Sequence, residues 1–211
     1  MSTWTSLDRT FCFYTASMAS RRPRPRERLL ATAGRLFYAE GIHTVPVDRL
    51  VTEAGVTRAT FYRHFPAKED LVVAYLRAAD AELRAGLEAM APRVPAAEGI
   101  TVLLDHTAAT IGAAGFRGCH FVNAAAEYPD PADPVRAVIA GHRAWLRDTV
   151  TELAERAGHP DPEYAGQVLV LLHDGARAGA GLDDPEGVRR AVLRAGRELL
   201  AASEAAPAES D

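Results

Sequence analysis

Apolar residues recur at intervals of three and four positions along most of this chain, which is the spacing that one buried face of an α-helix requires. The first stripe runs through Leu29, Ala33, Leu36 and Phe37, and similar stripes follow toward the C-terminus. Glycine and proline residues separate them, and no segment of the sequence shows the pattern of a β-strand ladder. We therefore predict an all-α fold of about nine helices. They are expected over residues 26–40, 47–54, 58–64, 71–87, 100–114, 121–127, 135–157, 163–180 and 185–202.

Two of these predicted helices, 47–54 and 58–64, are short and lie close together in the sequence. Gly55 follows the first, where helices commonly end in a left-handed residue, and Thr57 can cap the start of the second. Two short helices with such a brief connection are typical of a helix-turn-helix. The second helix of this motif enters the major groove of DNA, so we predict a DNA-binding module near the N-terminus.

The distribution of charge supports this assignment better than the net charge of −4 does. Residues 21–68 contain ten basic and four acidic residues, a net charge of +6, which leaves −10 for the rest of the chain. A basic N-terminal module therefore accompanies an acidic body. This asymmetry favours a polyanionic partner for the first part of the chain alone.

The chain divides into four predicted segments. Residues 1–20 and 204–211 are expected to be disordered tails, and Met18 is an alternative start of translation. Residues 21–66 form the predicted helix-turn-helix domain, and residues 67–203 form the predicted helical body.

The location of the protein is inferred from what the sequence contains. The apolar stretch 11–19 is far shorter than the roughly 20 residues that cross a bilayer, and Arg9 alone precedes it as a basic residue. Cys12 and Cys119 do not make the paired framework of a small secreted domain. We therefore expect no membrane span, no signal peptide and a cytoplasmic location.

The run from Asp48 to Leu71, DRLVTEAGVTRATFYRHFPAKEDL, resembles the DNA-binding signature of the tetracycline-repressor (TetR) family. The resemblance covers about residues 26–75, including two helices, their turn and the start of the next helix. It implies a homodimeric transcriptional regulator, by default a repressor, that leaves a palindromic operator when a small-molecule effector binds. No cofactor and no metal are expected. The operator, the effector, the regulated genes and the sense of regulation stay open.

The DNA contacts are expected mainly from residues 58–64. If Phe61 and Phe65 face the core, Arg58 and Arg63 point outwards, and arginine suits bidentate contact with guanine. The resemblance implies that Thr60, Tyr62 and His64 mainly hold the DNA backbone. The predicted DNA-binding residues are Arg24, Arg26, Thr44, Thr57, Arg58, Thr60, Tyr62, Arg63, His64 and Lys68.

Two positions depart from the pattern of the family. Where the family usually offers Thr or Ser to a phosphate, this chain has Val45 and Pro46, and Thr44 is a possible substitute. Where a Ser usually caps the fourth helix, this chain has Ala67, which should cost about 1 kcal/mol. Both departures weaken the list of contacts without threatening the fold.

The resemblance implies that the acidic body binds a small molecule and dimerises through its last two long helices. The stretch 117–129 resembles a sequence found in one branch of the family, which identifies the branch and not the ligand. Candidate pocket residues combine apolar and polar groups, as small-molecule sites usually do. They are Phe116, Cys119, Phe121, Asn123, His142, Trp145 and His173. Taken singly, each residue of this kind is more often part of the core or the surface than a ligand contact.

Small and apolar residues on the last two predicted helices would allow close packing between two chains. The candidate dimerisation residues are Val168, Leu171, Leu172, Gly175, Ala176, Gly179, Val188 and Val192. The alternative is that they form an ordinary core within one chain.

Two other classes of function are weighed against a regulator. An enzyme could start from Cys119 and His120, or from His173 and Asp174, but no third group orients either pair, and the histidines lack zinc-ligand spacing. We therefore expect no catalysis. An architectural DNA-binding protein would need no effector, but it would leave the long body without a purpose. Steep salt dependence regardless of sequence would identify it.

Overall fold

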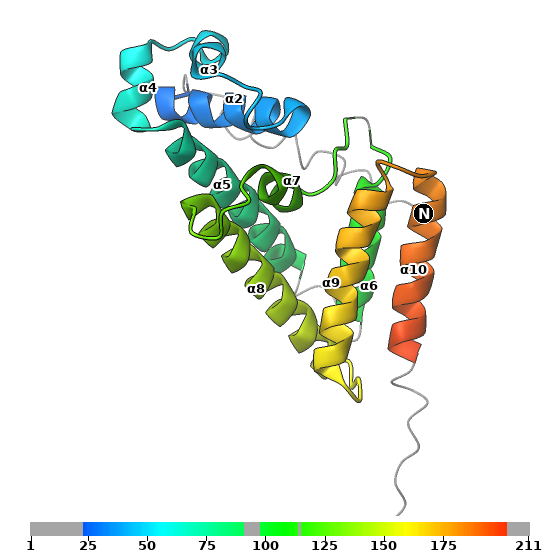
Figure 1. Cartoon of the computed structure of the whole chain (residues 1–211). Helices are drawn as coiled ribbons and strands as arrows, with labels where there is room; N and C mark the ends of the chain where they lie inside the picture. Colours follow the sequence, from blue (N-terminus) through cyan, green and yellow to red (C-terminus); the bar gives the residue numbers. More distant parts are fainter. Residues whose placement is uncertain (1–22, 91–97, 114, 202–211) are drawn as a thin grey trace, which may run out of the picture. The chain divides into compact units, whose positions relative to one another are not determined.

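The computed structural model describes residues 23–90, 98–113 and 115–201. Within these ranges all regular structure is helical, and the nine helices are labelled α2 to α10 in Figure 1. The prediction of an all-α fold is confirmed. The two predicted tails, 1–20 and 204–211, lie outside the described residues.

The helix bounds follow the predicted stripes closely. The helices are α2 (Pro25–Glu40), α3 (Val47–Ala54), α4 (Arg58–His64), α5 (Lys68–Met90), α6 (Gly99–Thr110), α7 (His120–Glu127), α8 (Pro134–Arg156), α9 (Pro162–Gly179) and α10 (Pro185–Ala201). The main difference is the end of α6, which the apolar stripe placed at residue 114. The helix stops earlier because Ile111 is extended and Gly112 takes a positive φ of 82°, which favours glycine.

The chain forms two compact units, Met1–Tyr75 and Leu76–Asp211. The boundary lies inside α5, beyond the boundary at residues 66 and 67 that the sequence suggested. Each unit has its own set of buried apolar residues.

The first unit is held together by side chains from α2, α3, α4 and the start of α5. Its largest fully buried residues are Leu29, Leu36, Val45, Leu50, Phe61, Leu71 and Val72. Each buried side chain of this size contributes about 1.5–3 kcal/mol relative to exposure. Val45 is 0% exposed, so the position where the family pattern suggests a phosphate-binding hydroxyl serves the core in this chain.

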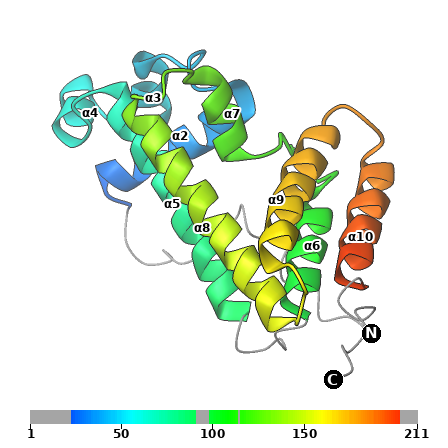
Figure 2. The ribbon, with the colours of Figure 1, turned by 60° about the horizontal axis from the view of Figure 1, so that its bottom comes forward.

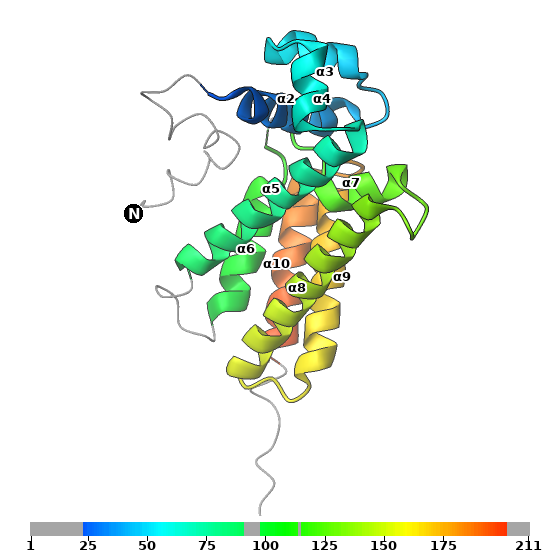
Figure 3. The same ribbon diagram turned by 90° about the vertical axis from the view of Figure 1, so that its left-hand side faces the viewer.

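The second unit is a helical bundle. α8 packs along α9, and α10 lies against both α6 and α9, as Figures 2 and 3 show from two directions. Ile100, Leu104, Val150, Leu169 and Val192 are among the buried residues that these helices share. Within the described ranges, no helix combines the length and the apolar character that a membrane crossing requires.

Gly166 allows α9 to approach α8 closely. A Cβ atom at this position would overlap the side chain of Thr151 and would lie 3.2 Å from its Cα atom. Gly141, also inside a helix, has open space around the same position. The two glycines therefore offer a matched pair of sites for the same substitution.

We expect Gly166→Ala to lower the free energy of unfolding by about 1–3 kcal/mol, because α8 and α9 must separate to admit the methyl group. Gly141→Ala, the control, should raise it by up to about 1 kcal/mol, because alanine is the better helix former. Urea unfolding followed by circular dichroism measures both. Equal effects of the two substitutions would contradict the close approach.

Candidate nucleic-acid interface and interior cavity

The turn between α3 and α4 is fixed at both ends by backbone and side-chain hydrogen bonds. Gly55 is left-handed (φ 61°, ψ 43°), and its N–H donates to the carbonyl of Thr52 at 3.2 Å. Thr57 is the N-cap residue just before α4, and its hydroxyl accepts the N–H of Thr60 at 3.1 Å. The capping role expected for Thr57 is therefore present, and the hydroxyl groups of Thr57 and Thr60 also lie 2.9 Å apart.

The two faces of α4 differ sharply. Phe61 is 0% exposed and Phe65, just after the helix, is 3% exposed, so both aromatic rings anchor the helix in the core. Arg58, Tyr62 and Arg63 are exposed on the other side. Residue types suited to hydrogen bonding with nucleic acid therefore project from a helix whose orientation is set by packing.

The two arginines of this exposed face are held differently. Arg58 Nε pairs with Asp48 on the first turn of α3 at 2.7 Å, with both side chains largely exposed. Such a pair contributes at most about 1 kcal/mol, so a stronger partner can displace it. Arg63 makes no hydrogen bond or ion pair within the described residues.

Arg28 is a positioning residue that the sequence did not single out. Its Nε donates to the carbonyl of Ala54 at 2.9 Å, and a terminal nitrogen donates to the carbonyl of Gly55 at 3.1 Å. These carbonyls belong to the end of α3, where a cation also suits the helix dipole. Arg28 therefore ties α2 to the turn that places α4. The sequence could not predict this role, because Arg28 and Ala54 are 26 positions apart and no local pattern connects them.

Two further arginines neutralise acidic residues on the surface of α2 and α3. Arg49 pairs with Glu40 and with Glu53, and Arg35 also pairs with Glu53. The hydrogen bonds from these arginines lower the pKa of both carboxyl groups. These two arginines are therefore occupied by carboxylates of their own unit, whereas Arg63 on α4 has no such partner among the described residues.

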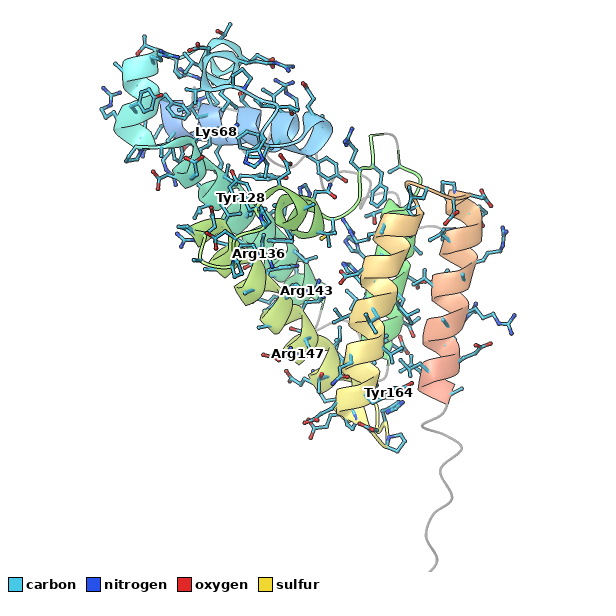
Figure 4. The ribbon with its side chains drawn as sticks, viewed as in Figure 1. Lys68, Tyr128, Arg136, Arg143, Arg147 and Tyr164 are labelled. Carbon is cyan, nitrogen blue, oxygen red and sulfur yellow. The ribbon has the colours of Figure 1, made fainter. Side chains whose placement is uncertain are left out.

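The remaining predicted basic contacts lie near the ends of helices. Arg24 is exposed at the start of α2, and Arg26 lies over the ring of Phe65, 5.3 Å from its centroid. Lys68, labelled in Figure 4, begins α5, and its Nζ donates to the carbonyl of Ile42 at 2.6 Å. This bond, rather than a phosphate, offsets the cost of a cation at the start of a helix in the free protein.

The polar groups near the family departures are used within the chain. The hydroxyl of Thr44 bonds to the carbonyls of Glu40 and Gly41 at 2.6 and 2.9 Å, so its proton is committed to the end of α2. Asp70 accepts the N–H of Ala67 at 2.9 Å, which supplies half of a capping interaction where the usual Ser is missing. His64 is partly buried at the end of α4.

The candidate pocket residues of the second unit separate into two places. Phe116, Cys119 and Asn123 line a cavity of about 370 Å³ between the segment before α7 and the second half of α9. Gly118 brings that segment against α9, because its φ is 83° and a Cβ there would lie 3.2 Å from the carbonyl oxygen of Arg177. Arg177 also lines the cavity, although the sequence did not single it out.

The other candidates form an interior cluster. The ring of Phe121 stacks on His142 at a centroid distance of 3.5 Å, and Trp145 lies 5.8 Å from the same imidazole. His142 Nδ1 lies 2.8 Å from a carboxylate oxygen of Asp80, which also pairs with Arg84 at 2.7 Å. This cluster therefore connects α7 and α8 to α5.

Electrostatics in the cluster follow from burial. Burial lowers the pKa of His142, although its hydrogen bond to Asp80 opposes this. Burial alone would raise the pKa of Asp80, but the bonds from Arg84 and His142 outweigh it and the pKa falls. His173, 9% exposed, contacts the hydroxyl of Thr107 at 3.1 Å.

The predicted dimerisation residues fall into two groups. Ala176 and Val192 are buried in the core of their own chain, and Leu172 and Val188 pack against it. Gly179 has Val188 as its nearest neighbour, and Val168 is half-buried. Leu171 and Gly175, by contrast, are exposed on α9.

Sequence reasoning missed two exposed apolar residues, one on α9 and one in the turn that follows it. Tyr164, labelled in Figure 4 near the start of α9, is 56% exposed, and Leu182 just beyond α9 is 85% exposed. Leu171 is 68% exposed and lies seven positions after Tyr164. Gly175 lies four positions after Leu171, and spacings of seven and four place Tyr164, Leu171 and Gly175 on one face of α9, whereas Leu182 lies in the turn that follows the helix.

The buried histidines predict that stability falls in acid. Burial, aided by the charge of Arg177, lowers the pKa of His120 to about 4 and that of His173 to about 3. The unfolded chain therefore takes up protons first, below pH 6.5. The folded state should lose about 1.4 kcal/mol per pH unit for each such histidine between pH 6.5 and its folded pKa.

We expect His173→Gln to reduce this loss, because glutamine can keep a hydrogen bond to Thr107 but does not titrate. Urea unfolding at pH 7 and pH 5 measures the difference. The control is His43→Gln at an exposed position. If both variants lost as much stability as the original chain, a neutral buried imidazole at residue 173 would be excluded.

Comparison with known proteins gives a consistent result. The model of the family described as bacterial regulatory proteins, tetR family, matches residues 29–75. YxaF, an HTH-type transcriptional regulator of Bacillus subtilis, is 39% identical over 49 residues, which are 23% of this chain and 26% of YxaF. An HTH-type regulator of Staphylococcus aureus is 39% identical over 46 residues, 22% of this chain and 25% of that protein. The match thus spans about a quarter of the length of these curated relatives.

Solved structures extend the similarity to nearly the whole chain. SCO4454, a TetR-family transcriptional regulator from Streptomyces coelicolor, is 49% identical, with a TM-score of 0.80, over 84% of this chain and 94% of its own. The protein sav143 from Streptomyces avermitilis is 29% identical, with a TM-score of 0.74, over 86% of this chain and 99% of its own. These relatives are named as regulators, and none of the names describes an enzyme. The chain therefore belongs to the TetR family of transcriptional regulators.

Proposed function

We propose that the chain is a homodimeric repressor that binds a palindromic operator through α4 and leaves it when a small molecule binds the second unit. The observation that carries the DNA-binding part is the exposed face of α4, with Arg58, Tyr62 and Arg63 outward and Phe61 fully buried. A helix held in this way can enter the major groove without rearranging its own core.

Recognition of the DNA base sequence is assigned to the two arginines of α4, Arg58 and Arg63. Arg63 has a guanidinium group without a partner among the described residues, and it can pair with O6 and N7 of guanine. Arg58 keeps its terminal nitrogens available while Asp48 holds its Nε. Arg24, Arg26, Tyr62, His64 and Lys68 are assigned to the phosphate backbone, and Thr57 and Thr60 to the start of α4. Thr44 is the weakest candidate, because its proton already serves α2.

Dimerisation is assigned to the exposed stripe of Tyr164, Leu171 and Gly175 on α9, together with Leu182 in the turn that follows. Large apolar side chains with such exposure commonly mark an interface with another protein. A symmetric pair of chains presents the same surface twice. It would place two copies of α4 about 34–36 Å apart, one turn of DNA, and so require a palindromic site.

Release from DNA requires that the effector bind the DNA-incompetent arrangement more tightly than the competent one. α5 is the proposed lever, because one continuous helix begins at Lys68 in the first unit and carries Asp80 and Arg84 in the second. Asp80 bonds to His142, which stacks on Phe121 of α7 beside the cavity segment. A ligand that displaces α7 would therefore act on a side chain connected to α5.

We expect Arg63→Ala to weaken binding to the selected operator about tenfold to a hundredfold, because one bidentate base contact is worth about 1–3 kcal/mol. The operator is first obtained by selection from random duplex DNA. Binding to random duplexes should change much less, and Arg156→Ala, an exposed arginine at the end of α8, is the control. An equal loss on both DNAs would make Arg63 a phosphate contact, and failure to enrich a palindrome would favour the architectural alternative.

We expect Leu171→Glu to convert the dimer into monomers, because it places a charge in an apolar interface twice, once from each chain. Sedimentation equilibrium of the original chain and the variant measures the change. Ala137→Glu, exposed on α8, is the control and should leave the dimer intact. A variant that stays dimeric would move the interface away from the stripe.

A further inference from the structure

The cavity of the second unit has the size of a site for a small molecule. Its volume of about 370 Å³ lies at the lower end of the roughly 300–1,000 Å³ typical of such sites. Phe116 and Val122 provide apolar wall, while the polar side chains of the lining are Arg117, Asn123, Asp174 and Arg177. The chemistry of these polar groups restricts what the cavity can hold.

Arg177 brings a positive charge into the cavity with little to balance it. One terminal nitrogen donates to the carbonyl of Gly118 at 3.2 Å, and the guanidinium lies 5.5 Å from the centroid of Phe116. Its Nε is buried and has no hydrogen-bond acceptor within the described residues. A buried donor without a partner typically costs about 1–3 kcal/mol.

The acidic residue of the cavity lining does not compensate this charge. Asp174 instead pairs with Arg143 at 2.7 Å, and Arg143 is labelled on α8 in Figure 4. That pair holds the carboxylate of Asp174 against another helix. Among the described residues, no carboxylate forms an ion pair with Arg177.

The histidines near Arg177 add no charge of their own at neutral pH. Burial is the main reason why the pKa values of His120 and His173 are low, and the charge of Arg177 lowers both further. Burial and Arg177 also lower the pKa of His106. The charged residues of the lining are thus Arg177, Arg117 and Asp174, of which Asp174 is paired with Arg143.

We infer that the effector is a small carboxylic acid, whose carboxylate pairs with Arg177 and whose apolar part packs against Phe116 and Val122. This inference rests on the proposed function, since it names the class of molecule that the repressor senses. A planar carboxylate matches the fork of N–H groups that a guanidinium presents. A cationic ligand is disfavoured by the same uncompensated charge.

The test compares acids with their amides on the full chain. Benzoate, phenylacetate, hexanoate and octanoate are titrated by calorimetry beside benzamide, phenylacetamide, hexanamide and octanamide. At least one acid should bind about tenfold or more tightly than its amide, because a hydrogen bond to a charged group is worth about 1.5–3 kcal/mol. If no acid of this panel binds, or if acids and amides bind equally, the inference is overturned.

Variants then locate the bound acid. Arg177→Gln should abolish the preference for acid over amide, Arg177→Lys should keep part of it, and Arg156→Gln should leave it unchanged. If Arg177→Gln does not fold, Arg177→Lys takes its place. A preference for acid over amide that is unchanged in Arg177→Lys would then overturn the inference. An acid preference that survives intact in Arg177→Gln would overturn the inference.

DNA release is measured separately with the same acids and the selected operator. An acid that binds through Arg177 without releasing DNA would support the cavity chemistry and contradict effector release. Release of DNA by neutral molecules, unaffected by Arg177→Gln, would support effector release and contradict the carboxylate inference. The failure of the inference and the failure of the proposed function are therefore distinguishable.

Discussion

Burial of Phe61 determines which side of α4 faces outward, and the DNA-binding surface depends on it. The ring is fully enclosed by residues of the first unit, and Phe65 reinforces it from just beyond the helix. A helix of seven residues has little stability of its own, so packing rather than helix propensity holds it. The exposed residues of α4 contribute little to this packing and are therefore available for DNA recognition.

The second unit depends on a different constraint, the desolvation of polar groups. His173 keeps one hydrogen bond to Thr107 and stays neutral, while Asp80 stays charged because Arg84 and His142 bond to it. Each of these groups would be costly without its partner. Among the described residues, the Nε of Arg177 is a buried donor without such a partner, and the charge of its guanidinium is a reason for an anionic ligand to bind there.

Much of this structure could be predicted from the order of the residues. The inward direction of Phe61 and the cap at Thr57 both follow from local spacing, which is why the first unit was the easier part to anticipate. Arg28 and the bond between His142 and Asp80 could not be predicted, because the partners are 26 and 62 positions apart. Such contacts depend on how helices cross, which periodicity does not report.

The same limit explains why some of the predicted dimerisation residues on α9 are buried in their own chain and others are exposed. A small or apolar residue indicates packing but not the identity of its neighbour, so Ala176 and Leu171 looked alike in the sequence. Ala176 is 6% exposed in the core of its own chain, whereas Leu171 is 68% exposed. The candidate pocket divided for the same reason, since His142 and Cys119 both looked like lining residues.

The uninterrupted course of α5 across the boundary between the two units restricts how the length of this chain can change. Each residue added to an α-helix turns the remainder of that helix by about 100° and advances it by about 1.5 Å. One residue inserted between Tyr75 and Leu76 would therefore change the angular phase of every later residue of α5. The connection between α9 and α10, which is a surface loop, can vary in length without such a rotation.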